Sequence, residues 1–204
     1  MELPSSFQIE LSQAVNCLVK GGVVVFPTDT LYGLGADISN GPALTRIYNI
    51  KGRPQQMALP VLVSDWNQVL SITNGMSDAG YHLAELYWPG PLTLVAHKSP
   101  NLSRLVTGGL DTVAVRQPDH WVPLHLAAEL GPITGTSANL TGQPDLLNID
   151  AIQGQLGSMV DLFIKCGPTP KGTSSTVVDI TTEIPLLIRE GALPFTEVLA
   201  VCGL

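Results

Sequence analysis

Apolar residues recur along this chain at two different spacings, and each spacing predicts a different secondary structure. Between Gln8 and Lys20 they repeat at helical spacing, and Gly21 and Gly22 are expected to end this helix. Residues 23–26, VVVF, form a compact apolar run that predicts a strand inside the protein. The stretch PTDTLYGLGAD follows directly and brings hydroxyls, a carboxylate and two glycines. We therefore expect this strand to end at the floor of a ligand site.

The two patterns continue to the end of the chain and predict a mixture of helices and strands. Further helices are predicted between Pro42 and Gly52, near 65–71 and 77–87 with Ser64 and Ser77 as N-caps, near 120–130 and 150–156, and at 196–202. Further strands are predicted at 59–63, at 92–97, at 112–116, from Ile133, and at 161–167, 175–180 and 185–191. No repeat or linker interrupts them, so we predict one α/β domain over residues 1–204. It should contain a twisted mixed β-sheet with flanking helices.

Composition and charge restrict the location and the partners. Of 204 residues, 45% are apolar and 13% charged, and the net charge is −7, which gives no general attraction for a nucleic-acid backbone. Cys17, Cys166 and Cys202 are few, distant and odd in number, which fits a reducing compartment, and no cysteine–histidine cluster predicts a metal site. Neither a signal peptide nor a membrane span is recognisable. The expected location is the cytoplasm, without membrane contact.

Several predicted strands carry a small polar or cationic side chain where they begin or end. These side chains are Thr28 and Thr30, Arg116, the group Thr136, Ser137 and Asn139, the group Ser174, Ser175 and Thr176, and Arg189. Because ligands of open α/β sheets bind at strand ends, we expect these groups to meet. With Lys51 and Arg53 they would form a central concave cationic pocket. Guanidinium groups there suit carboxylates and phosphates.

The tetrapeptide Lys51-Gly52-Arg53-Pro54 has two interpretations. Gly52 permits a tight turn, and Pro54 favours an extended conformation at Arg53, so both cations could stand on a stiff loop beside a phosphate. Basic residues also commonly end helices, where they interact favourably with the helix dipole. The tetrapeptide alone does not separate a binding role from a capping role.

The other candidates also have structural explanations. Thr28, Thr30, Ser137 and Asn139 could be turn residues, Arg116 and Arg189 could pair with surface carboxylates such as Glu190, and Tyr32 could be an aromatic residue at the rim of the core. The glycine-rich motifs of common nucleotide-binding folds and the nucleophile elbow of hydrolases are missing. Any nucleotide site must therefore be assembled from scattered strand ends.

Seven short blocks resemble, in their order, the threonylcarbamoyl-AMP synthase family and its YrdC-like fold. The blocks are FPTDTLYGLGAD, KGRP, WPGPLT, GLDTVAVRQPDH, TSANLTG, SSTVVDI and LLIREG. They extend from about Gly21 to Gly191, which is nearly the whole chain. Because the sequence ends at Leu204, the additional C-terminal domain of longer relatives is not expected, and the chain resembles the short, single-domain type.

The resemblance implies a nucleotidyltransferase reaction. Family members join L-threonine, bicarbonate or CO2 and ATP into L-threonylcarbamoyladenylate and release pyrophosphate. Separate transferase proteins then pass the threonylcarbamoyl group to an adenosine of certain tRNAs. Magnesium is expected to accompany ATP. No protein nucleophile is needed, and a weak or local contact with RNA stays open.

The resemblance also implies roles for single residues. Lys51 and Arg53 match the K-x-R motif that holds phosphates, which makes them the expected catalytic residues. The expected ATP-binding residues are Lys51, Arg53, Thr112, Ser137, Asn139 and Arg189. The expected threonine-binding residues are Thr30, Tyr32, Arg116 and Ser175, with Arg116 suited to the carboxylate and Thr28 close by. No residue is expected to hold a metal.

Three positions depart from the family pattern. Many relatives have lysine or asparagine followed by proline where this chain has Met57 and Ala58, and some have histidine where Leu62 stands. One contact to ATP and one to threonine could therefore be missing or be made by the backbone. The alternative functions are a non-catalytic YrdC-like paralogue that binds nucleotide or RNA, and a carbamoyl-transfer role like that of related domains in hydrogenase maturation.

Overall fold

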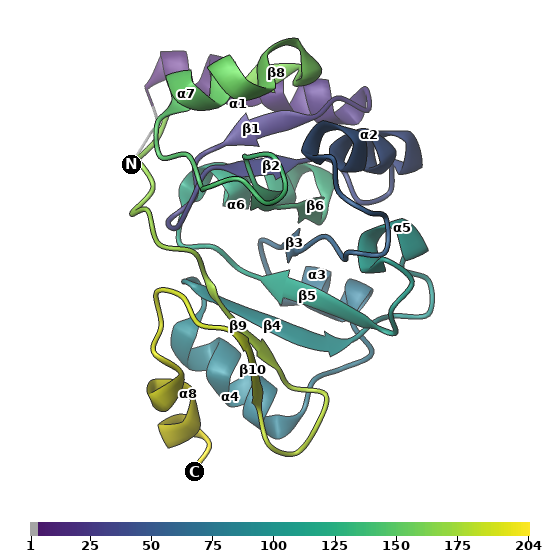
Figure 1. Cartoon of the computed structure of the whole chain (residues 1–204), viewed down its shortest axis with the longest axis vertical. Helices are drawn as coiled ribbons and strands as arrows, with labels where there is room; N and C mark the ends of the chain where they lie inside the picture. The colour runs from purple at the N-terminus through teal and green to yellow at the C-terminus, as the bar shows by residue number, and fades with distance from the viewer. Residues whose placement is uncertain (1–3) are drawn as a thin grey trace.

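Two mixed β-sheets form the framework of the protein and follow one another along its long axis (Figure 1). The computed structural model describes residues 4–204. The smaller sheet has the order β7-β2-β1-β8, formed by Thr136–Ser137, Gly33–Gly35, Val24–Phe26 and Leu162–Phe163. The larger has the order β10-β9-β4-β5-β3-β6, formed by Leu186–Arg189, Thr176–Asp179, Leu92–His97, Thr112–Arg116, Val61–Leu62 and Ile133–Thr134. The predicted mixed α/β architecture is confirmed, but the prediction of one sheet is wrong.

The chain changes from one sheet to the other at Gly135. Strand β6 pairs with β3 in the larger sheet, and β7, which begins one residue after Gly135, pairs with β2 in the smaller sheet. A Cβ atom at Gly135 would lie 2.4 Å from Cγ of Leu62, so only glycine permits this close approach. The prediction of one strand running from Ile133 into a loop missed this change, because it depends on which strands lie on either side.

Helices cover both sheets. They are α1 (Ser5–Val19), α2 (Gly41–Lys51), α3 (Trp66–Ile72), α4 (Asp78–Tyr87), α5 (Arg104–Thr107), α6 (Trp121–Leu130), α7 (Ile149–Leu156), α8 (Phe195–Val201) and a 3₁₀ turn at Gly157–Met159. Ser77 caps α4 as predicted, but α3 is capped by Asp65 and not by Ser64. The short elements β2 and α5 were not predicted, because three or four residues carry too little periodicity. Within residues 4–204, no helix is long and apolar enough to cross a membrane.

Strand β1 is buried on both faces, as its unbroken apolar run predicted. Val24 and Phe26 pack in the hydrophobic cluster that contains Leu11 of α1, whereas Val25 packs on the other face in the cluster that contains Leu44 of α2. Successive side chains of a strand point to opposite faces, so two cores hold this one strand. They fix the position at which β1 ends and the polar loop 27–32 begins.

Gly35 in β2 offers a test of this packing. A Cβ atom at Gly35 would lie 2.5 Å from the carbonyl oxygen of Thr134 and 2.6 Å from the ring of Phe26. We expect Gly35→Ala to lower the free energy of unfolding by about 2–3 kcal/mol, as overpacking does in close-packed cores. Equilibrium unfolding in urea measures this change.

Gly154→Ala is the matched control. Gly154 lies inside α7, and nothing would be within 4 Å of its added Cβ atom. Alanine there should raise stability by about 0.5–1 kcal/mol, because it restricts the unfolded chain and favours the helix. Equal effects at the two glycines would contradict the packing described for β2.

Candidate functional site

A central cavity of about 190 Å³ lies between the two sheets, and both contribute to its wall. Its lining residues are Thr28, Thr30, Leu31, Tyr32, Gly33, Arg53, Pro60, Leu62, Thr93, Ala114, Arg116, Gly135, Thr136, Ser137, Ser174, Ser175, Val177 and Arg189. The predicted meeting of strand ends is thus found, and three arginines line the cavity without any aspartate or glutamate. Of the predicted site residues, Lys51, Thr112 and Asn139 are outside this lining.

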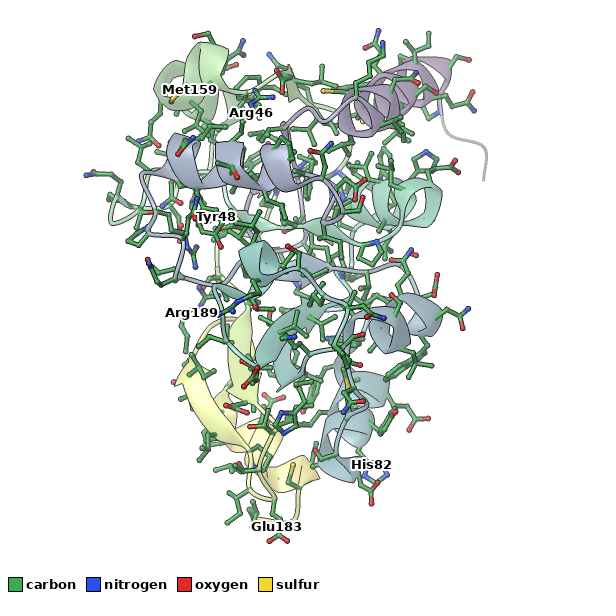
Figure 2. The ribbon with its side chains drawn as sticks, turned by 90° about the vertical axis from the view of Figure 1, so that its right-hand side faces the viewer. Arg46, Tyr48, His82, Met159, Glu183 and Arg189 are labelled. Carbon is green, nitrogen blue, oxygen red and sulfur yellow. The ribbon has the colours of Figure 1, made fainter. Side chains whose placement is uncertain are left out.

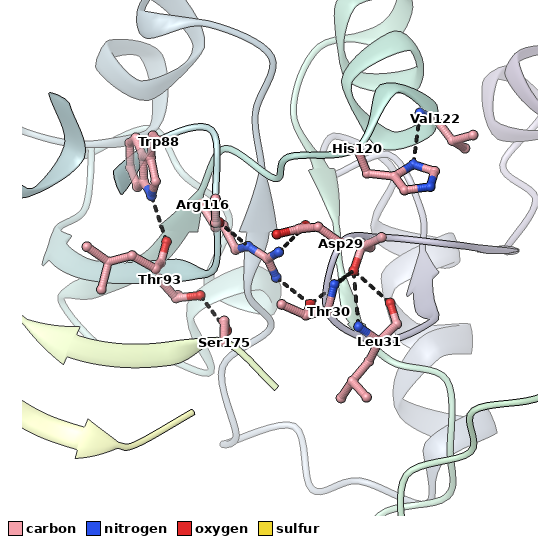
Figure 3. Close-up of polar contacts among 12 residues, drawn as sticks. Asp29, Thr30, Leu31, Trp88, Thr93, Arg116, His120, Val122 and Ser175 are labelled. Carbon is pink, nitrogen blue, oxygen red and sulfur yellow. Dashed lines mark hydrogen bonds and ion pairs between the residues drawn. The ribbon is translucent and has the colours of Figure 1, made fainter. Parts of the chain in front are cut away.

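Arg116 is the most enclosed cation of the cavity. Its Nε donates to the carbonyl oxygen of Gly90 at 2.9 Å, its Nη1 donates to Oγ1 of Thr30 at 2.8 Å, and its Nη2 donates to Oδ1 of Asp29 (Figure 3). The partner is therefore the buried Asp29 and not a surface carboxylate such as Glu190. Burial lowers the pKa of Arg116, Asp29 raises it again, and the nearby cation of Arg189 lowers it further.

The hydroxyls next to Arg116 form an ordered chain. Thr28 donates from Oγ1 to the carbonyl oxygen of Leu31 at 2.7 Å, so its only hydroxyl proton is used there. Thr30 must then donate to Thr28 across the 3.0 Å contact between their Oγ1 atoms. Thr30 Oγ1 therefore acts as an acceptor for Arg116 and can accept from a ligand as well. Thr28 makes the hydrogen bonds of a turn residue, as the structural interpretation held, and both threonines line the cavity.

Lys51 ends α2 and turns its ammonium toward the segment after β7. Its Nζ donates to the carbonyl oxygens of Ser137 at 2.5 Å and Asn139 at 2.8 Å, and to Oδ1 of Asn139 at 3.2 Å. The side chain is only 3% exposed, and burial followed by repulsion from Arg53 lowers its pKa to about 8. Lys51 is outside the cavity lining and therefore holds the Ser137–Asn139 segment from the side away from the cavity. Ser137 donates from Oγ to Oδ1 of Asn139 at 2.7 Å and presents this segment to the cavity.

Arg53 reaches the cavity from the loop after α2. Its Nη2 donates to the carbonyl oxygen of Ala58 at 2.6 Å, and its Nη1 donates to Oγ1 of Thr136 at 3.3 Å. Its Nε is buried and has no hydrogen-bond partner in the part of the chain that the structure describes. Burial lowers the pKa of this guanidinium. A buried donor without a partner is costly, and an acceptor such as an anion in the cavity would offset this cost.

Arg189, at the end of the edge strand β10, closes the opposite side of the cavity. Its Nη2 donates to the carbonyl oxygen of Ser175 at 2.8 Å and to Oγ of Ser175 at 3.3 Å. Figure 2 shows Arg189 midway along the molecule, far from Glu183 at the tip of the same hairpin. Oγ of Ser175 is also 2.9 Å from Oγ1 of Thr93, so two hydroxyls meet beside this cation.

Known proteins resemble this protein over most of the chain. The Sua5/YciO/YrdC family model, described as "Telomere recombination", matches residues 16–191. The chain belongs to this family. It is 39% identical to the threonylcarbamoyl-AMP synthase of Bacillus subtilis over 95% of this chain and 57% of that protein, and 37% identical to that of Vibrio vulnificus over 89% and 98%. The Pyrococcus abyssi Sua5 structure complexed with L-threonine superposes with a TM-score of 0.90 at 38% identity, over 95% of this chain and 57% of that one.

The departures from the family pattern fall at two places around the cavity. Met57 is 44% exposed, and the hydroxyl of Tyr48 lies 3.1 Å from its carbonyl oxygen and 2.8 Å from that of Leu105, so the two share one proton. The carbonyl oxygen of Ala58 accepts from Arg53. The backbone therefore holds this loop whichever side chain stands at position 57. Leu62 lines the cavity directly, and with Pro60, Ala114 and Val177 it makes an apolar side of the wall.

Two site residues were missed by the sequence analysis, and one predicted residue lies apart. Asp29 lies in the cavity loop, between Thr28 and Thr30. Thr93 lies on β4 and is buried beside Ser175 because β9 pairs with β4, which the sequence does not reveal. The position of Asp29 inside the PTDT motif was the one available signal. Thr112 is on the same face of β5 as Ala114 and Arg116, but at the end of the strand away from the cavity.

Proposed function

We propose that this protein is a threonylcarbamoyl-AMP synthase, a nucleotidyltransferase that forms L-threonylcarbamoyladenylate and pyrophosphate from L-threonine, bicarbonate or CO2, and ATP. The observation that carries the proposal is the enclosed Arg116 beside the acceptor Thr30, in a cavity whose other cations are Arg53 and Arg189. The close match to the threonine-bound Pyrococcus abyssi Sua5 supports the same reaction. It favours this function over the non-catalytic paralogue.

The amino-acid substrate suits the inner end of the cavity. Arg116 would bind the carboxylate, Thr30 and Ser175 would bind polar groups of threonine, and the apolar wall around Leu62 would accept its methyl group. A volume of about 190 Å³ is below the roughly 300–1,000 Å³ of pockets for larger ligands. Only the phosphates of ATP would therefore enter the cavity, and its nucleoside would lie at the rim, in the direction of Thr112. Tyr32 would form part of the cavity wall.

The chemical step needs positioning and charge neutralisation more than a protein nucleophile. The amine of threonine would add to CO2, or to bicarbonate with loss of water, and form a carbamate. A carbamate oxygen would then attack the α-phosphorus of ATP, an oxygen–phosphorus bond would form, and the bond from the α-phosphorus to the bridging oxygen of the β-phosphate would break to release pyrophosphate. Arg53 and Arg189 would neutralise charge on the phosphates, and Ser137 would lie beside them in the cavity wall, with its hydroxyl proton donated to Asn139. Repulsion between Arg116 and Arg189 lowers the pKa of Arg116, and a bound polyanion would relieve it.

Magnesium would arrive with the nucleotide and not as a resident ion. The residues that line the cavity supply hydroxyls and guanidinium groups, and no cluster of three or more histidine, cysteine, aspartate or glutamate side chains occurs among residues 4–204. Such a donor set does not suit a protein-held divalent cation. Oxygens of the triphosphate and water would hold it, where it would neutralise phosphate charge.

The product implies a downstream partner. A mixed anhydride with AMP is reactive, so we infer that separate transferase proteins accept it and modify adenosine in tRNA. Direct contact with RNA would be weak or local, because the chain carries a net charge of −7. Cytoplasmic location is part of this proposal, and it is supported by three free cysteines.

A single assay tests the reaction. The protein is incubated with ATP, magnesium, bicarbonate and labelled L-threonine, and both pyrophosphate and labelled threonylcarbamoyladenylate are measured. We expect pyrophosphate release that depends on threonine and on bicarbonate, and its loss in Arg53→Ala but not in the exposed Arg104→Ala. Pyrophosphate release that ignores threonine would reject the function, and nucleotide binding without turnover would favour the paralogue.

A further inference from the structure

We propose that Asp29 is a positioning residue, which holds the guanidinium of Arg116 in the orientation that binds the carboxylate of the amino-acid substrate. The inference rests on the proposed function and adds a residue to it. Asp29 is not among the residues that line the cavity, so it acts through Arg116 and does not touch the substrate. The juxtaposition that carries it is a buried ion pair in which Arg116 lines the cavity and Asp29 lies outside the lining (Figure 3).

Two chain segments hold Arg116: the loop that contains Asp29 and Thr30, and the turn that contains Gly90. The acceptors are the carbonyl oxygen of Gly90, the hydroxyl of Thr30 and the carboxylate of Asp29. Each accepts a hydrogen bond from a different nitrogen of Arg116. A guanidinium has five N–H bonds, so two remain for a ligand. Of the three acceptors, Asp29 alone is charged, and it is therefore the strongest constraint on the plane of the guanidinium.

The degree of burial makes this constraint important. The side chains of Arg116 and Asp29 are 6% and 5% exposed, so the guanidinium has almost no water to replace a lost partner. Without Asp29 its charge would lack a counter-ion before substrate binds, and the side chain would gain by turning toward solvent or another acceptor. The negative charge of Asp29 also repels a substrate carboxylate. We infer that the gain in orientation outweighs this repulsion, because Arg116 keeps two N–H bonds free and the neutral pair is already desolvated.

The molecule contains a matched ion pair without this role. Arg46 and Asp161 lie 2.8 Å apart, but their side chains are 40% and 39% exposed, and they are outside the cavity lining. Arg46 is next to Met159 on the surface in Figure 2 and donates to its carbonyl oxygen at 3.3 Å. Asp161→Ala therefore removes an aspartate from an arginine outside the cavity lining. It also removes the acceptor of the Val23 N–H, which is 2.7 Å from Oδ2 of Asp161, so it should lose some stability.

The experiment compares Asp29→Ala, Asp29→Asn and Asp161→Ala with wild type. Calorimetry measures the dissociation constants of L-threonine and of ATP separately, and the threonine-dependent assay gives kcat and KM. We expect Asp29→Ala to weaken threonine binding and raise its KM by about 30-fold, as loss of one partner of a buried charged pair does, with less than threefold change for ATP. Asp29→Asn keeps an oxygen acceptor and should recover most of the affinity. Asp161→Ala should bind threonine and ATP as wild type does, even where it is less stable to unfolding.

A double-mutant cycle shows whether Asp29 acts through Arg116. In an Arg116→Lys background the planar guanidinium with its paired N–H donors is already lost. Adding Asp29→Ala should therefore change threonine affinity by less than about threefold. Full additivity of the two changes overturns the inference, and so does an Asp29→Ala protein that binds threonine as tightly as wild type or more tightly. Equal weakening toward threonine and ATP indicates a general structural role and overturns it too. If wild type neither binds threonine nor turns it over, the proposed function fails, and the inference fails with it.

Discussion

Arg116→Ala is expected to lower kcat/KM for threonine by about 10³-fold, the scale on which loss of one preorganised charged donor acts. The substitution removes the enclosed cation of the cavity and leaves Asp29 as a buried carboxylate without its partner. A substrate carboxylate would then meet a negative charge where it had met a positive one. The measurement is the rate of threonine-dependent pyrophosphate release as a function of threonine concentration, at saturating ATP and bicarbonate.

ATP binding separates this loss from a loss of folding. The phosphates are expected to contact Arg53, Ser137 and Arg189, so the dissociation constant of ATP should stay within about threefold of wild type if Arg116→Ala folds. The exposed Arg104→Ala serves as the control for removal of one arginine. Unchanged dependence on threonine in Arg116→Ala would remove Arg116 from the amino-acid site.

Lys51→Ala is expected to reduce both activity and stability. All three protons of the ammonium are donated to oxygens of Ser137 and Asn139. Without them the carbonyl oxygen of Asn139 loses its donor, whereas the other two oxygens keep one each, so the cost is about 2 kcal/mol in the free energy of unfolding. The Ser137–Asn139 segment would shift, and small misplacements of groups that position a substrate cost about 10²-fold in rate. We therefore expect kcat/KM for ATP to fall about 10²-fold, measured beside urea unfolding.

The lowered pKa of Lys51 predicts that stability rises with pH while activity falls. Its pKa is lowered by burial, and next by Arg53, from 10.5 to about 8. Between these values the unfolded chain keeps a proton that the folded protein has released, so this group makes the free energy of unfolding rise with pH. A neutral amine has two N–H bonds for three acceptors, so kcat/KM should fall as pH rises through about 8.

Lys165→Ala is the control for both measurements. Lys165 is 55% exposed and lies 3.8 Å from a carboxylate oxygen of Asp150, so its removal should change neither ATP use nor the pH profile. A Lys51→Ala protein with normal kcat/KM for ATP would show that the Ser137–Asn139 segment keeps its place without the ammonium. A flat profile between pH 7 and 9.5 in wild type would contradict the lowered pKa of Lys51.

Local sequence pattern was sufficient to predict most elements and the residue types of the site. The predicted strands 92–97 and 112–116 are β4 and β5 to the residue, because an apolar strand core with polar ends is a property of neighbouring residues. The same pattern placed Arg116 and Arg189 at strand ends. Since ligands bind at such ends, it predicted a shared cavity.

Which side chains become partners could not be read from the pattern. Arg116 and Asp29 are 87 residues apart, and Lys51 and Asn139 are 88 apart, so each contact exists only after distant segments have come together. The crossing between the sheets at Gly135 also depends on pairing with distant strands, because β6 pairs with β3 and β7 pairs with β2. Residue type and spacing determine what a segment prefers locally, whereas the enclosure of Arg116 and the turning of Lys51 away from the cavity depend on burial beside distant segments, where water no longer competes for their protons.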